Sequence, residues 1–427
     1  MNGHFKIRGI LAFVLSCFAI ESASLCALAK ADDFVRQARR LSTRIRGLPF
    51  TADDVELNQM VQRLRAGDRV GAARIAMYSA PNRLRREFLA NTIRQWGAPM
   101  IKRNQDPRDV ALNDGLGLIM GIVRDGRHIG EILYSDQLYG VVLDPANNQV
   151  STLPASYANA DNMGLDFSDP QRFRAVDGKV RASNRVIPAT EVGGIYTADS
   201  SIDIHEAGTG RRVWEHFSST FWRLKMDELR FAEAPYNAPV TRIRGDVDRN
   251  PLGDGVGFFL TSCKTCHGIL DSLGTAFCHV VEFDDNVTRG IAYTNDTDRG
   301  DDDGDEDGLV CAPKYYRNIG VYRDTLAPAY SPSNGGWINP FTPAMNQRYG
   351  WEGPMSGTGV NSLMRALALA TQTYRGMVVR AVELACPGIS LDNAIIDALA
   401  ADLKRQGDLR SVFERVAVLD QCLGTAL

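Results

Sequence analysis

Apolar residues recur at helical spacing over much of the chain. The clearest stripe has the i, i+3, i+4, i+7 spacing of one buried helix face and consists of Leu57, Met60, Val61 and Leu64. Thr51 is placed to cap this helix, and Gly67 is placed to end it. Related patterns predict further helices at about residues 33–46, 69–79, 81–96, 108–125 and 211–228.

The middle and the end of the chain have different patterns. Residues 140–205 are rich in Gly, Asn, Asp and Pro with weak period-two runs, which predicts loops with a few strands. Near the end, one apolar stripe consists of Tyr374, Met377, Val378 and Ala381. Ser390 is placed to cap a helix that contains Ile396, Leu399 and Leu403. Gly407 is expected to end that helix, and Asp408 to begin the last one.

The amino terminus is typical of a secretory signal. Lys6 and Arg8 precede an apolar stretch from Ile10 to about Ile20, and small residues favour cleavage near Ala29 or Ala31. The stretch is too short to span a bilayer, so we expect a soluble periplasmic or otherwise exported protein with no stable membrane span. A lipid anchor at Cys26 and an uncleaved amphipathic anchor are the alternatives.

The most specific motif is Cys263-Lys-Thr-Cys266-His267, which has the C-x-x-C-H spacing of covalent c-type haem attachment. On one turn of helix, positions i and i+3 project to the same side, so both thiols reach the two vinyl groups of one porphyrin. The following histidine then ligates the iron from below. The motif predicts one covalent haem c, while a zinc site or a redox dithiol remains an alternative.

The sixth iron ligand would separate electron transfer from catalysis, because a methionine there raises the reduction potential and an open site permits peroxide or oxygen chemistry. We favour Met355, on a Trp- and Gly-rich segment after Pro354. The other candidates are Met345, Met364, Met377 and His279. Trp337 and Trp351 are expected to pack around the haem edge.

An acidic run occupies residues 295–307, with eight acids and one arginine. Asp303, Asp305 and Asp307 alternate before Gly308, as in the start of a calcium loop, but Lys314 replaces the bidentate Glu of a complete EF-hand. The run predicts a Ca²⁺ site or else a solvated loop. The net charge of −3 becomes −3 + 7 = +4 without this run, which gives no argument for nucleic-acid binding.

Six cysteines remain after removal of the signal, and four of them lie outside the haem motif. In an oxidising compartment we expect nearest-neighbour pairing, Cys278 with Cys311 and Cys386 with Cys422, with free thiols as the alternative. Nucleophile-elbow, zinc-protease and phosphate-loop motifs do not occur in the sequence. A nucleophilic or nucleotide-driven enzyme therefore lacks its parts.

Three blocks of sequence resemble the planctomycete-type cytochrome C proteins. After the haem motif, Asp271, Leu273, Gly274 and Ala276, then Glu282, Phe283 and Asp284, are similar to strings that follow C-x-x-C-H in that family. The runs "ARRLSTRIRGLPFTADDVE" and "GVNSLMRALALATQTYRGMVVRAVELAC" resemble its opening and closing helical domains. Ser272 stands where the family usually has Pro, and the family's role is largely unassigned, so the resemblance implies an exported haem protein without naming a reaction.

Together these observations predict a mainly α protein, and a composition of 44% hydrophobic and 23% charged residues suits a globular core. We expect a signal peptide at 1–29, a helical amino-terminal region with a loop-rich middle at 30–245, and a haem c domain at 246–427. That last domain would contain an acidic, loop-rich insertion at 285–312 and the carboxy-terminal helices. The predicted function is electron transfer with a redox partner protein. A haem peroxidase or oxidase, or a scaffold protein with an accessory haem, is the alternative.

Overall fold

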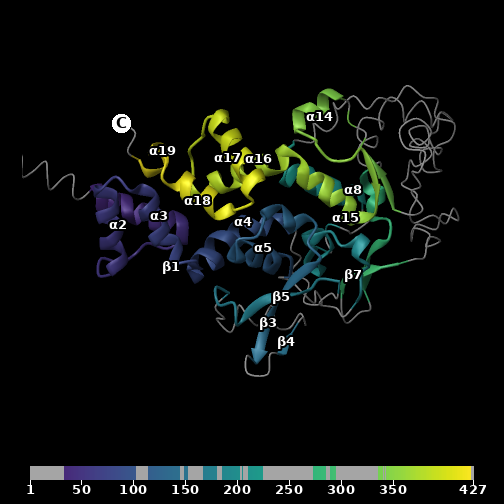
Figure 1. Ribbon diagram of the computed structural model, residues 1–427, viewed down its shortest axis with the longest axis horizontal. Coiled ribbons are helices and arrows are strands. Elements are labelled where there is room, and N and C mark those ends of the chain that lie inside the picture. Colours follow the sequence, from purple (N-terminus) through teal and green to yellow (C-terminus); the bar gives the residue numbers. More distant parts are fainter. Residues whose placement is uncertain are drawn as a thin grey trace, which may run out of the picture.

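A computed structural model describes residues 33–101, 114–144, 149–151, 167–179, 185–201, 204, 210–224, 273–284, 289–294, 335–339, 341 and 343–424. Helices dominate these residues, and the strands are few and short, so the predicted mainly α class is confirmed (Figure 1).

The amino-terminal helices follow the predicted periodicity. A helix covers residues 33–46, and α2 covers Val55–Arg65. The predicted stripe on α2 is buried as expected, but Asp54 is its N-cap and not Thr51. Helix α3, Arg69–Met77, begins at Asp68, whose side chain accepts a hydrogen bond from the Gly71 N–H.

Residues 81–96 do not form the single helix that their pattern predicts. Strands β1 (Tyr78–Ala80) and β2 (Arg83–Leu84) pair through a tight turn in which Asn82 has a φ of 62°. Asn tolerates this left-handed conformation better than most residues, which allows the chain to reverse here. The helical part then follows as the π-helix η1 (Phe88–Ile93), α4 (Arg94–Gly97) and η2 (Ala98–Met100).

The middle of the chain combines one buried helix with a small sheet and short 3₁₀ turns, in agreement with the expected loops and few strands. Helix α5 (Asp114–Asp125) packs on β3 (Gln137–Asp144). Strand β3 is the centre of an antiparallel sheet with β4 (Gln149–Ser151) and β5 (Phe173–Asp177). The 3₁₀ turns are η3 (Ile129–Leu133), η4 (Ala189–Glu191), η5 (Gly194–Thr197) and η6 (Asp199–Ser201).

The next helix is shorter than predicted: α8 covers Gly210–Thr220, and Arg223 already has a φ of 57°. After it come η8 (Thr275–Phe277) and the antiparallel pair β6 (Val280–Asp284) and β7 (Arg289–Tyr293). Strand β7 falls within the insertion 285–312 that was expected to be rich in loops. A second pair joins β8 (Gly336–Ile338) to β9 (Ser356–Thr358), with α14 (Pro343–Tyr349) between them.

The carboxy-terminal helices are α15 (Gly359–Leu369), α16 (Thr371–Ala385), α17 (Asn393–Gln406), α18 (Leu409–Ala417) and α19 (Asp420–Leu423). The predicted apolar stripe of α16 is buried. The N-cap of α17 is Asp392 and not Ser390, because the Asp392 carboxylate accepts from the Ala394 N–H. Gly407 ends α17 in the left-handed conformation, and Asp408 caps α18, both as predicted.

Helices from the two ends of the chain share one hydrophobic core. The purple amino-terminal helices lie beside the yellow carboxy-terminal ones in Figure 1, and α3 contacts α18. Ion pairs join Arg69 to Asp420 and Arg74 to Glu414, and the Trp96 indole donates to the Met377 carbonyl at 3.2 Å. The expected boundary at residue 245 lies outside the described residues.

The predicted disulfide between Cys386 and Cys422 is present and fastens α19 to the end of α16. Because it closes a loop with a sequence separation of 36, the chain-entropy model gives it a stabilisation of about 4 kcal/mol. Cys278 is disulfide-bonded too. Its predicted pairing with Cys311 stays a prediction, because Cys311 lies outside the described residues.

Candidate functional site

The predicted haem ligands Cys263, Cys266 and His267 lie outside the described residues, but the chain that follows them is fixed in the core. Leu273 and Ala276 are fully buried, and Phe277 is nearly so. The short turn η8 contacts α8, α15 and β8. A group attached at His267 would lie within six residues of chain, at most roughly 21 Å, of Leu273.

Aromatic rings line the α8 side of this region. Trp214 stacks on Phe217 with ring centroids 5.7 Å apart, and it meets Trp222 edge-on at 5.4 Å. Phe341 lies 6.0 Å from Trp214, and Tyr349 stacks on Trp222 at 4.8 Å. All five side chains are buried. This aromatic cluster is a rigid apolar surface of the kind that suits a flat macrocycle.

Trp214 differs from the other buried tryptophans because its indole N–H has no acceptor. Trp222 Nε1 donates to Thr373 Oγ1 at 2.9 Å, and Trp337 Nε1 donates to Ser362 Oγ at 2.7 Å. Trp214 Nε1 is buried without a hydrogen-bond partner. An unsatisfied buried donor costs about 1–3 kcal/mol, so an acceptor supplied by a bound molecule would remove a real penalty. Nothing local in the sequence singles out this tryptophan.

Met355 lies next to the strand pair that contacts η8. Its carbonyl accepts from the Asn339 N–H at 2.8 Å, just beyond the end of the β8–β9 ladder. The side chain is 47% exposed, and its sulfur lies 3.7 Å from Asn339 Nδ2 and 3.8 Å from Asn346 Nδ2. Met355 is therefore half-exposed, and among the described residues its thioether has two weak amide contacts.

His279 is the second accessible candidate. Its Nδ1 lies 3.0 Å from the Thr294 carbonyl oxygen, which can only accept a hydrogen bond. In neutral His279 the proton therefore sits on Nδ1, and Nε2 presents a lone pair, as in histidines that bind metals. The ring also lies beside Gly335, at the opposite end of β8 from Asn339.

Geometry separates these two candidates from each other. The stretch from Gly335 to Asn339 is four residues of extended chain, or roughly 13 Å at the rise of a β-strand. His279 and Met355 thus mark opposite ends of the β8–β9 pair, and one iron would take only one of them.

The remaining ligand candidates are poorly placed. Met364 and Met377 are buried in the helical core, with at most 1% of their surface exposed, and Met345 is partly buried against it. Trp337 and Trp351 pack edge-on at 6.4 Å beside Met355, which agrees with a packing role. The proposed haem edge itself is not described.

The predicted calcium ligands Asp303, Asp305 and Asp307 also lie outside the described residues. Within the residues that the structure does describe, no group of three or more His, Cys, Asp and Glu side chains is arranged to hold a metal ion. The calcium site therefore stays a prediction from the sequence.

Buried carboxyl groups adjoin the region as well. Glu191, on η4, is 5% exposed and accepts a hydrogen bond from the Val360 N–H at 3.3 Å. Burial raises the pKa of Glu191, and the nearby His279 opposes this shift only in part. This carboxyl links the start of α15 to η4.

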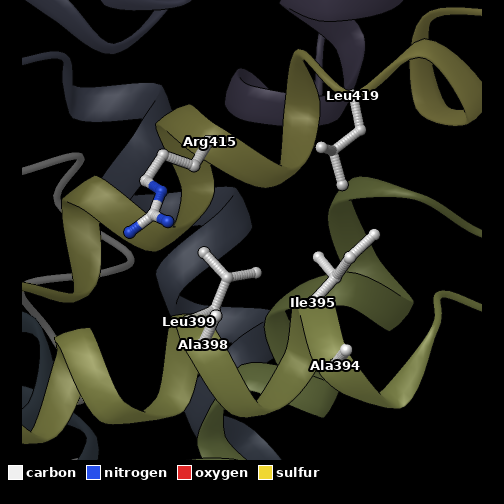
Figure 2. Close-up of a pocket in the computed structure, with 6 residues that line it drawn as sticks. All are labelled: Ala394, Ile395, Ala398, Leu399, Arg415 and Leu419. Carbon is white, nitrogen blue, oxygen red and sulfur yellow. The ribbon is translucent and has the colours of Figure 1, made fainter.

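A hollow of about 350 Å³ lies among the carboxy-terminal helices, away from the aromatic cluster. Figure 2 shows Ile395 and Leu399 of α17 facing Leu419, with Arg415 of α18 at the rim. Arg415 is already paired with Asp402 at 2.6 Å. The lining contains no Cys, His or Met side chain, so this hollow supplies no haem ligand.

No helix of the described chain combines the length and apolar character that crossing a membrane requires. Comparison of the whole sequence and structure with protein-family models, with curated proteins and with solved structures found no match. The likeness to planctomycete-type cytochrome C proteins accordingly rests on the residues quoted above.

Proposed function

We propose that this protein is an exported monohaem c-type cytochrome that transfers electrons to or from a partner protein. The observation that carries the proposal is the Cys263-x-x-Cys266-His267 motif behind a secretory signal. When bound, the haem supplies an iron that changes between its ferric and ferrous states. Cys263 and Cys266 would tether the porphyrin, and His267 would ligate the iron.

The described residues fit such a group in their chemistry. His267 precedes Leu273 by six residues, so their Cα atoms are separated by at most roughly 21 Å. This reach would hold the proposed haem within that distance of Leu273, which adjoins η8. The aromatic cluster is apolar and closed to water, and the Trp214 N–H within it has no acceptor among the described residues.

Met355 is our choice for the sixth ligand, with His279 as its alternative. Met355 is half-exposed, and the two amide contacts of its sulfur are weak enough to be exchanged for a bond to iron. A filled sixth position closes the iron to peroxide and oxygen, which favours electron transfer over catalysis. An open position would favour the peroxidase or oxidase alternative.

The first test is haem attachment to the full chain, exported from a host with c-type maturation. We expect an intact-mass increase of one haem in the secreted protein and its loss in the Cys263→Ala/Cys266→Ala double variant. Unmodified mass in the matured wild-type protein would refute the proposal.

The second test addresses the sixth ligand by absorption spectroscopy of the ferric protein. We expect a low-spin spectrum with a methionine-to-iron charge-transfer band that disappears in Met355→Ala. Met345→Ala, a methionine on neighbouring α14, is the matched control and should keep the band. Loss of the low-spin spectrum in His279→Gln alone would transfer the role to His279. A high-spin wild-type spectrum with peroxide turnover would support the peroxidase.

A further inference from the structure

A polar cleft lies where the two ends of the chain meet. It has a volume of about 750 Å³ and is formed by the end of α2, by α3, by the β1–β2 turn and by the start of α18. In Figure 1 these elements lie at the contact between the purple and yellow helices. A cleft of this volume is within the usual range for sites that bind small molecules.

The acidic groups of the cleft are all engaged by the protein itself. Asp68 accepts from the Gly71 N–H at 2.8 Å and from Arg63 Nη1 at 2.9 Å. Asp408 accepts two hydrogen bonds from the Arg410 guanidinium, at 2.7 and 2.9 Å. The third acid, Glu414, is buried.

Glu414 is 6% exposed and accepts from Arg74 Nε at 3.2 Å. Burial raises the pKa of Glu414, and the nearby Arg74 opposes this shift. Each of the three acids is therefore paired with an arginine of the same cleft, Asp68 with Arg63, Asp408 with Arg410 and Glu414 with Arg74.

The basic groups retain unused donors. A guanidinium has five N–H groups, and the Arg74 side chain is 63% exposed with only its Nε paired among the described residues. Arg63 is 59% exposed and uses one terminal nitrogen, Nη1, in the same part of the structure. The two guanidiniums come from different helices and line one cleft, so N–H donors that are unpaired among the described residues are available to a ligand from both helices.

We propose that this cleft binds a small organic anion with two or three carboxylates, held by Arg74 and Arg63. Carboxylates are the acceptors that guanidinium groups bind most directly, in planar paired hydrogen bonds. A ligand with several carboxylates offers paired acceptors to both guanidiniums. The inference does not depend on the haem.

Calorimetric titration of the full secreted chain at low ionic strength tests this proposal, with citrate as the probe. Arg74→Gln should weaken citrate binding at least tenfold. Arg65→Gln is the matched control, because Arg65 is an exposed arginine of α2 that does not line the cleft, and it should leave the affinity within about twofold. Circular dichroism would establish that each variant is folded.

A variant that is expected to strengthen citrate binding separates an effect on binding from damage to the fold. Glu414→Gln removes the internal carboxylate that competes for Arg74, so citrate affinity should increase severalfold. The absence of binding heat would overturn the proposal. Equal losses of citrate affinity in Arg65→Gln and Arg74→Gln would overturn it too, as would an unchanged or weaker citrate affinity in Glu414→Gln. Inorganic phosphate that binds as tightly as citrate would refute the requirement for several carboxylates.

Discussion

The contact between Phe88 and Phe413 tests whether the two ends of the chain fold as one unit. Phe88 on η1 and Phe413 on α18 are fully buried, and their rings meet edge-on with centroids 5.7 Å apart. Truncation of a buried phenylalanine to alanine costs about 3–5 kcal/mol. This is a large part of the about 5–15 kcal/mol that stabilises a typical domain, so Phe88→Ala should strongly lower the urea midpoint of the described helices.

The ring–ring interaction itself is measured with a gentler double-mutant cycle. Phe88→Leu and Phe413→Leu keep apolar volume but remove the aromatic edge-to-face contact, which is worth about 0.5–1.5 kcal/mol. The loss in the double variant should therefore be smaller than the sum of the single losses by that amount. Phe277→Leu, at a buried phenylalanine on η8, is the control partner and should be additive with Phe88→Leu.

Urea denaturation followed by far-UV circular dichroism gives both results. A single transition that moves as a whole in Phe88→Ala is expected, because the helices of both ends share a core. Two transitions, of which Phe88→Ala moves only one, would refute the shared unit. Additivity of the Phe88→Leu and Phe413→Leu losses would show that the edge-to-face geometry contributes nothing measurable.

Two further predictions concern close packing and pH. Gly376→Ala should destabilise the protein by at least about 2 kcal/mol in urea denaturation, because the new Cβ would lie 1.6 Å from the Phe221 carbonyl oxygen. Gly67→Ala is the control for backbone strain: its Cβ would meet no atom within 4 Å, but its φ is 79°. Burial raises the pKa of Glu191, so the folded state retains a proton that the unfolded chain has lost, and stability should fall as pH rises from the ordinary value of 4.5 toward the raised one. Glu191→Gln should flatten this slope in melting temperatures measured from pH 4.5 to 7, and parallel wild-type and variant curves would contradict the assignment.

The helices were predictable from the sequence where their stability depends on one buried face. The stripes of α2 and α16 have regular apolar spacing, and the structure buries them as expected. Helix ends were less predictable. Ser390 and Asp392 are both suitable cap residues by type, and only the backbone path decides that Asp392 accepts from a free N–H, whereas Asp54 begins α2 without a side-chain cap hydrogen bond.

The errors lie where non-local contacts decide the structure. Residues 81–96 have helical spacing, but Pro81 and Asn82 favour a turn, and the chain reverses before the helix begins. The segment that contains strand β7 was expected to be rich in loops, because the acidic residues after the strand dominate the local composition. Its partner β6 alone supplies the hydrogen bonds that make it a strand.

The candidate site has the same division between local and non-local information. The haem motif is complete within five residues, so the sequence alone predicts covalent attachment. The surroundings are not local: α8, η8 and the β8–β9 pair meet only through tertiary packing. Whether Met355 or His279 is closer to the motif, and whether Trp214 has an acceptor, could not be inferred from spacing.

The buried position of Leu273 bears on whether Met355 or His279 is the sixth ligand of the proposed haem. Leu273 and Phe277 are buried against α8 and α15, which fixes the end of the tether that leads back to His267. In the proposed cytochrome, a short tether with a fixed end would confine the iron to within reach of Leu273, whereas His279 and Met355 lie at opposite ends of a strand. The identity of the sixth ligand would then report the direction in which the proposed haem leaves η8, and with it which face of the β8–β9 region a redox partner would approach.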